Sequence, residues 1–167
     1  VGENTVTLTV TDAAGNTDEC TTIVNILDDE VPMASCLNEI TLSLDATGNS
    51  NITVANINNG SSDNCDFTTT INQSSFDCTN VGENTVTLTV TDAAGNADEC
   101  TTTVNIVDDI LPTASCVDDF TLALGSDGTA NITAADINDG SSDNCNLTLT
   151  INPSSFTCGN LGENIIT

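Results

Sequence analysis

Apolar residues alternate with threonines through residues 85–91, where Val86, Leu88 and Val90 occupy every second position. A period of two places one set of side chains in a core and the other in water, as in a β-strand. The alternation resumes at Cys100, after a polar stretch with a Gly-Asn pair that suits the positive φ of a turn. The pattern therefore predicts a β-hairpin.

This hairpin recurs along the chain with a period of 80 residues. Residues 1–29 repeat residues 81–109 with three substitutions, and a further copy begins at Leu161. A repeat of this length suits one small β domain whose thin core needs disulfides or metal ions. The expected segments are the last hairpin of a preceding repeat at 1–29, a complete repeat at 30–109 and an incomplete repeat at 110–167.

Further alternating runs precede the hairpin within the complete repeat. The expected elements are a strand at 36–44, a turn at 45–49, a strand at 51–55, a loop at 56–64 with room for one helical turn, and short strands at 65–71 and 76–78. Short strands separated by turns about every 8 to 12 residues are typical of β-sandwiches. We therefore expect an all-β chain of tandem immunoglobulin-like sandwiches.

The charge of the chain excludes nucleic acid as a partner. There is no Lys, Arg or His, and the 25 acidic residues give a net charge of -25. Such a chain does not bind nucleic acid, and its carboxylates repel one another unless they are dispersed, screened or neutralised by bound cations. No apolar stretch reaches the length of a transmembrane helix, so no membrane insertion is expected.

The eight cysteines predict disulfides, because the chain has neither His nor a CxxC pair for zinc. Disulfides imply an oxidising, extracellular compartment. The chain also lacks the His or Lys base of a catalytic triad and has few aromatic residues for a sugar platform. We therefore expect no enzymatic activity.

The order of motifs in the complete repeat resembles a known family. An Asp-Asn-Cys motif ending at Cys65, a second cysteine at Cys78, the GENTVTLTVTDAAGN stretch at 82–96, and Cys100 before an acidic pair and a proline follow one another. This order resembles the HYR (hyalin repeat) domain, and more closely the tandem repeats of very large Bacteroidota surface adhesins, including gliding-motility adhesins. The resemblance covers all 167 residues.

The resemblance implies a non-catalytic stalk or filament segment on the cell surface, for attachment or gliding motility. Its partners would be neighbouring repeats, with any surface glycan bound by a tip outside these residues. The alternative is that the repeats themselves bind a glycan or protein. The four phenylalanines lie on apolar strand faces, where we expect them to pack in the core: Phe67, Phe76, Phe120 and Phe156.

The expected topology brings acidic and amide side chains to both junctions between repeats. Carboxylate and amide oxygens are the ligands that Ca²⁺ prefers. The alternative is that these side chains are solvated turn residues. The candidate ligands at the first junction are Asp28, Asp29, Asp63, Asn64, Asp92, Asn96 and Asp98, and those at the second are Asp108, Asp109, Asp143 and Asn144.

Four cysteines in a repeat allow three disulfide pairings. We expect Cys36 to bond Cys100, because the first and last strands are neighbours in such sandwiches. The remaining pairs would then be Cys65–Cys78 and Cys145–Cys158. Cys20 and Cys116 are left without partners. Either the chain belongs to a longer polypeptide, or separate copies polymerise head to tail by exchanging hairpins.

Overall fold

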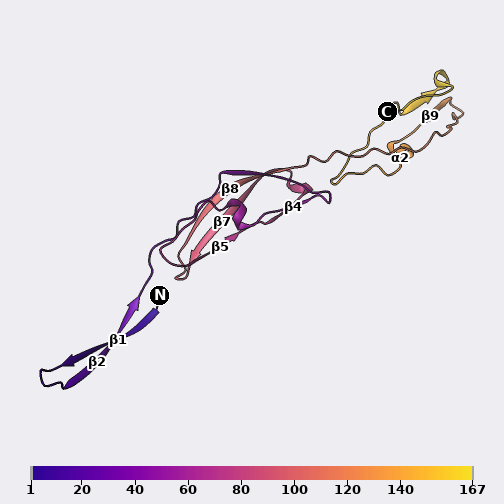
Figure 1. Cartoon of the computed structure of the whole chain (residues 1–167). Coiled ribbons are helices and arrows are strands. Elements are labelled where there is room, and N and C mark those ends of the chain that lie inside the picture. Colours follow the sequence, from indigo (N-terminus) through magenta and orange to yellow (C-terminus); the bar gives the residue numbers. More distant parts are fainter. Residues whose placement is uncertain (1, 167) are drawn as a thin grey trace. The chain divides into compact units, whose positions relative to one another are not determined.

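A computed structural model describes residues 2–166 (Figure 1). The fold is all-β, with only short helical turns between the strands, as the sequence predicts. The strands are β1 (Gly2–Thr11), β2 (Thr17–Ile26), β3 (Glu39–Ser43), β4 (Asn49–Asn51), β5 (Phe67–Ile71), β6 (Ser75–Asp77), β7 (Gly82–Asp92), β8 (Ala97–Val107), β9 (Thr129–Asn131) and β10 (Ser155–Thr157). The helical turns are α1 (Val54–Ile57), η1 (Cys78–Asn80), α2 (Ala134–Ile137) and η2 (Cys158–Asn160).

The chain forms two compact units, and the complete repeat contributes to both. The first unit comprises the chain up to Thr41 together with Asn51–Ser75 and Gly82–Asn105. The second comprises Leu42–Ser50, Phe76–Val81 and the chain from Ile106 onward. The expected division of the chain into segments at 29/30 and 109/110 stays a prediction.

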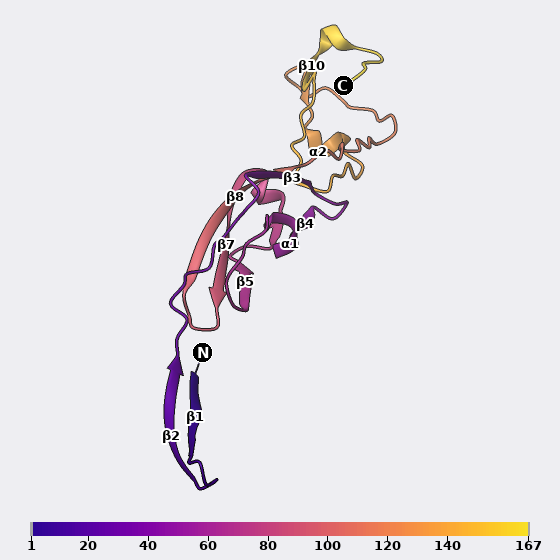
Figure 2. The ribbon, with the colours of Figure 1, turned by 60° about the vertical axis from the view of Figure 1, so that its left-hand side comes forward.

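The β7–β8 hairpin forms the middle of the main sheet, whose strand order is β3-β8-β7-β5. Figure 2 shows β5 beside β7 and β8 on the other side of β7. β5 is antiparallel to β7, with Phe67 opposite Asp92. Val86, Leu88 and Val90 have exposed fractions of 0 %. The alternation seen in the sequence therefore marks a strand whose apolar face is completely buried.

A second sheet, β4 with β6, and the α1 turn complete the core of this repeat. Asn56 Oδ1 accepts hydrogen bonds from the Thr53 backbone N–H at 2.7 Å and from its hydroxyl at 2.9 Å, which caps the start of α1. Ile57, at the end of α1, is fully buried. The single helical turn allowed for by the sequence is therefore present, and it carries a core residue.

The four phenylalanines do not all pack in the core. Phe76 and Phe156 are buried, whereas Phe67 is 37 % exposed and Phe120 is 48 % exposed. Phe67 begins β5, which is an edge strand of the main sheet. Phe120 lies in the incomplete repeat, where residues 118–124 form no strand. The expectation that all four are core residues is therefore wrong for Phe67 and Phe120.

Cys36 and Cys100 form a disulfide with a Cα–Cα distance of 5.8 Å, the pair that the sequence predicts. The sheet order explains it, because β3 follows Cys36 and lies next to β8, which contains Cys100. The Thr102 hydroxyl donates to the Leu37 carbonyl at 2.8 Å and fixes the same register. The segment that leads into β3 is therefore joined covalently to β8.

The other two predicted pairs, Cys65–Cys78 and Cys145–Cys158, are wrong. Cys78 instead bonds Cys145 of the following repeat, with a Cα–Cα distance of 5.6 Å. Cys65 lies against Asp28 in the linker that enters the repeat, residues 28–30. Cys78 lies against Gly48 in the turn after β3. The chain between them does not reverse, because β5 and β6 carry it onward. The disulfide therefore joins successive repeats.

Four cysteines are free among residues 2–166, two more than the sequence predicts. They are Cys20, Cys65, Cys116 and Cys158, and all four are exposed. The sequence predicts no partner within the chain for Cys20 or Cys116. Cys65 and Cys158 are free because the observed bond uses Cys78 and Cys145 instead.

Candidate metal centre

The turn between β7 and β8 orients the first acidic side chain of the candidate site. Asp92 ends β7, and its Oδ1 accepts the backbone N–H groups of Gly95 at 2.6 Å and Asn96 at 2.8 Å. Gly95 has a φ of 97°, a conformation that favours glycine. The turn thereby holds a carboxylate that is only 7 % exposed.

The side chain of Asn96 attaches this turn to the linker that enters the repeat. Its amide nitrogen donates to the backbone carbonyls of Asp28 at 3.3 Å and Glu30 at 3.2 Å, and to Asp92 Oδ2 at 2.8 Å. The sequence predicts Asn96 as a metal ligand. In the structure its amide group spans the linker and the turn, and so brings Asp28 towards Asp92.

Three carboxylates meet where the linker reaches the repeat. Oxygen atoms of Asp28, Asp63 and Asp92 lie within 4.8 Å of one another. Asn64 Nδ2 donates to Asp28 Oδ1 at 3.2 Å. Asp28 Oδ2 and Asp63 Oδ1 are buried and have no hydrogen-bond partner among residues 2–166. Two buried acceptor oxygens next to a third carboxylate are unfavourable unless a cation is bound.

The chemistry of these donors fits a hard divalent cation. Carboxylate oxygens are the preferred ligands of Ca²⁺, and the chain has no Lys, Arg or His that could pair with them instead. Burial acts to raise the pKa of Asp92. The hydrogen bonds from Asn96 and Gly95 outweigh burial, so the pKa of Asp92 lies below its ordinary value. Asp92 is therefore ionised and able to bind a metal at neutral pH.

The thiol of Cys65 borders the same cluster. Its hydrogen bond to the Asp28 carboxylate, with desolvation and the nearby charges of Asp28 and Asp63, raises the pKa of Cys65. The thiol is therefore protonated at neutral pH and is not a metal ligand in this form. The sequence places Cys65 in a disulfide and does not indicate this contact.

Three of the predicted ligands lie outside the cluster of carboxylates. Asp98 accepts the Ala34 backbone N–H at 2.9 Å and so fixes the linker. Asp109 accepts the Ser43 hydroxyl at 2.9 Å. Asp29 is exposed. The structure gives Asp98 and Asp109 roles in positioning the chain.

The second junction brings together Asp108, Asp143 and Asn144. Asn144 Nδ2 donates to Asp108 Oδ1 at 3.1 Å and to the Asp45 backbone carbonyl at 3.2 Å. Asp143 Oδ1 and Asn144 Oδ1 are buried without a hydrogen-bond partner in the described part of the chain. This arrangement repeats that of Asn64 with Asp28.

Sequence reasoning missed the part that Gly48 plays at the second junction. Gly48 has a φ of 74°, and a Cβ at this position would lie 2.6 Å from the Asn144 carbonyl oxygen and 2.7 Å from Cys78 Sγ. Only glycine therefore allows this close approach. The signal in the sequence is the recurrence of glycine one period later, at Gly128.

The complete repeat matches a known domain family. A family model described as the HYR domain matches residues 27–106. The comparison with curated proteins finds no match. Among residues 2–166, no helix has both the length and the apolar character needed to cross a bilayer. The disulfides and the match together indicate a non-enzymatic, extracellular, adhesion-type module. Residues 27–106, which include most of the complete repeat, are thus similar to the HYR domain.

Proposed function

We propose that the chain is a structural segment of an extracellular repeat filament, of the kind that large Bacteroidota surface adhesins use for attachment or gliding motility. The observation that carries this proposal is the Cys78–Cys145 disulfide. It joins two successive repeats by a second covalent route beside the peptide chain. A bond at this position suits a protein that transmits force along a row of domains.

The contacts around this bond support the same role. Asn144 reaches both Asp45 and Asp108, and Gly48 packs directly against the backbone of Asn144. The junction between the two repeats therefore combines a disulfide, two hydrogen bonds and a close backbone contact. The chain needs no catalytic group for this role.

Force spectroscopy tests whether the disulfide protects the join. The measurement uses Cys36→Ser/Cys100→Ser as the background, because the Cys36–Cys100 bond overlaps the Cys78–Cys145 bond and would by itself keep the chain short. When this background is pulled from its ends, an intact Cys78–Cys145 bond shields the intervening segment, a sequence separation of 67 residues. At about 3.4 Å per extended residue, reduction should release roughly 230 Å of additional length. Adding Cys78→Ser/Cys145→Ser should release the same length without reductant. The matched control is Cys116→Ser, which removes a free thiol.

Equal extension of the Cys36→Ser/Cys100→Ser background with and without Cys78→Ser/Cys145→Ser under oxidising conditions would contradict the mechanical role. Extension is scored after the chain has been mapped for its disulfides. Trypsin does not cleave a chain without Lys or Arg, so the mapping uses an enzyme that cuts at Asp or Glu.

Calcium at the junctions is the second part of the proposal. At the first junction Asp28, Asp63 and Asp92 would hold the ion, and at the second Asp108 and Asp143 would do so with the amide oxygen of Asn144. The buried oxygens without hydrogen-bond partners support this proposal. A bound ion would turn repulsion between the carboxylates into attraction and stiffen the linker.

Calorimetry with and without calcium tests the first site. The melting temperature should rise with millimolar Ca²⁺ and fall with a chelator. Asp63→Ala should reduce that difference to the share of the second site, whereas Asp66→Ala should keep it whole, because Asp66 is exposed and outside the cluster. Equal melting temperatures in calcium and in chelator would mean that these carboxylates are ordinary turn residues.

A further inference from the structure

The two disulfides of the chain overlap along the sequence. Cys36 bonds Cys100. Cys78 lies between these two residues in the sequence and bonds Cys145, which lies beyond them. Two bonds that followed one another would each shorten a separate stretch of chain, whereas overlapping bonds share a stretch. The shared stretch is residues 78–100.

The overlap determines which residues carry a pulling force once the chain is taut. Force from the N-terminal side crosses the Cys36–Cys100 bond and enters the shared stretch at Cys100. Force from the C-terminal side crosses the Cys78–Cys145 bond and enters it at Cys78. The shortest covalent connection between Cys36 and Cys145 is therefore residues 78–100. At about 3.4 Å per extended residue, this stretch spans roughly 75 Å.

The two other covalent connections are longer and stay slack. The route along residues 36–78 would span roughly 140 Å, and the route along residues 100–145 roughly 150 Å, at the same rise per residue. The second route contains residues 108–110, the peptide linker that enters the following repeat. A taut chain therefore passes its load through the Cys78–Cys145 bond and leaves this linker unloaded.

The stretch under load contains a central, deeply buried strand. Residues 78–100 comprise η1, β7, the turn and the start of β8. β7 lies between β8 and β5 in the main sheet (Figure 2). Its side chains Val86, Leu88 and Val90 are fully buried. To extend this stretch, a force has to remove β7 from both the sheet and the core.

The residues at the two ends of this stretch are closely packed. Cys78 Sγ lies so close to Gly48 that a Cβ added to the glycine would be 2.7 Å from it. Thr102, two residues after Cys100, is fully buried and donates its hydroxyl hydrogen to the Leu37 carbonyl at 2.8 Å. Each disulfide therefore transmits force to backbone that is already held by its neighbours.

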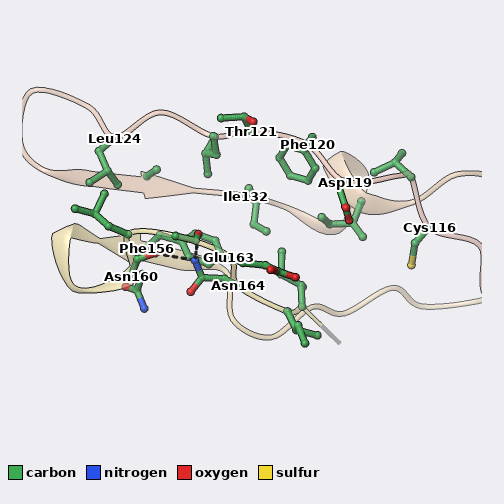
Figure 3. Close-up of a pocket in the computed structure, with 18 of the residues that line it drawn as sticks. Cys116, Asp119, Phe120, Thr121, Leu124, Ile132, Phe156, Asn160, Glu163 and Asn164 are labelled. Atoms are coloured by element: carbon green, nitrogen blue, oxygen red, sulfur yellow. Dashed lines mark hydrogen bonds between the residues drawn. The ribbon is translucent and has the colours of Figure 1, made fainter.

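The unloaded residues include part of a cavity wall in the incomplete repeat. Figure 3 shows Phe120, Leu124 and Ile132 beside a cavity of about 780 Å³. All three lie between Cys100 and Cys145 in the sequence, so a taut chain does not load them. The loaded route therefore runs through the closely packed β7 and avoids this open packing.

We propose that the overlapping disulfides make β7 the load-bearing strand of the complete repeat, and that each bond limits extension when the other is lost. This inference rests on the proposed role in transmitting force. Loss of one bond moves the load to residues 36–78 or to residues 100–145, and lengthens the taut chain by only about 70 Å or about 80 Å. Loss of both bonds lengthens it by roughly 300 Å.

Force spectroscopy on four forms of the full chain tests the route. The chain is pulled through peptide tags fused to its ends, and its contour length is compared with both bonds, with either bond alone and with neither. Cys36→Ser/Cys100→Ser should add about 70 Å, Cys78→Ser/Cys145→Ser about 80 Å, and the combination roughly 300 Å. In every form Ser replaces the free cysteines, which could otherwise exchange with the bonds: Cys20, Cys65, Cys116 and Cys158.

Contour lengths are measured on extended chain, so they do not depend on the stability of a variant. Increments of about 220 Å and about 230 Å for the two pairs of substitutions would overturn the proposal, because bonds that act separately give these values. Failure of the proposed function has a different signature. In that case, loss of the Cys78–Cys145 bond would add no length to the Cys36→Ser/Cys100→Ser background.

A second experiment identifies the strand under load. Val86→Ala, in β7, should lower the unfolding force more when both bonds are present than in the Cys36→Ser/Cys100→Ser background, where the load moves to residues 36–78. Ile52→Ala is the matched control, because Ile52 is also buried in the core but lies within residues 36–78. Its effect should be larger in that background. Equal effects of Val86→Ala with and without the Cys36–Cys100 bond would overturn the assignment of β7.

Discussion

At the scale of single residues, the join between the two repeats depends on a glycine that no other residue can replace. Gly48→Ala would place a Cβ against the Asn144 carbonyl at a φ of 74°. Gly60 is the matched control, because its φ is 83° but nothing lies within 4 Å of its added Cβ. Both substitutions should destabilise the chain by about 1 kcal/mol through backbone strain.

Gly48→Ala should cost more than Gly60→Ala, because only Gly48 also meets a backbone atom of the next repeat. Urea unfolding followed by far-UV circular dichroism measures both, since the chain has no Trp or Tyr for fluorescence. Gly48→Ala should also slow closure of the Cys78–Cys145 bond. Equal losses for the two variants would show that the contact with Asn144 has no energetic weight.

A second residue-scale prediction concerns the caps of α1 and α2. Asp136 accepts the Thr133 backbone N–H and hydroxyl, each at 2.8 Å, where Asn56 makes the same contacts to Thr53. The Thr133 hydrogen bonds lower the pKa of Asp136 from 3.8. A lowered pKa means that the cap stabilises α2 above pH 3.8 and is lost as pH falls through the lowered value.

NMR can follow this titration through the Thr133 backbone amide. Its chemical shift should change with a midpoint below pH 3.8, and Asp136→Asn should remove the change while keeping the cap. The Thr53 amide is an internal control, because Asn56 does not titrate. A midpoint above pH 3.8, or an equal response at Thr53, would contradict the assignment.

At the scale of secondary-structure elements, the Cys36–Cys100 bond joins the segment before β3 to β8, the last strand of the complete repeat. It closes a sequence separation of 64 residues, for which the loop-entropy relation gives a stabilisation of about 4 kcal/mol. Cys36→Ser/Cys100→Ser should lose a comparable amount in urea unfolding. Cys20→Ser should leave stability unchanged, because Cys20 is free and exposed. A small loss in the double variant would mean that β3 and β8 are held chiefly by the sheet and the core.

At the scale of the whole molecule, the net charge predicts that salt stabilises the chain. The 25 acidic residues have no Lys, Arg or His to pair with, so their mutual repulsion opposes the compact state. Added salt screens this repulsion.

Urea unfolding at about 0.01 M and at about 0.15 M NaCl measures this effect, because the screening length falls from about 30 Å to about 8 Å between them. The free energy of unfolding should be larger at the higher salt concentration. Equal values at the two concentrations would contradict the prediction.

The sequence by itself determined the features that depend on local period and on neighbouring strands. Alternation at Val86, Leu88 and Val90 predicts a buried strand face, and the structure buries it completely. Cys36 precedes β3 and Cys100 lies in β8, and these strands must be neighbours once the repeat closes, so the pairing followed from topology. The approach of Asp63 and Asp92 to the linker followed in the same way.

Where two repeats offer residues at equivalent positions, the sequence cannot choose between them, and only the tertiary structure decided which one forms the contact. Cys65 and Cys145 occupy equivalent positions, so the sequence around them cannot show which one Cys78 bonds. The choice depends on where the next repeat packs, and there Asn144 meets Gly48. Phe67 has the pattern of a core residue but begins an edge strand and stays partly exposed. Local patterns specify which face of a strand is apolar, whereas long-range packing determines what covers that face.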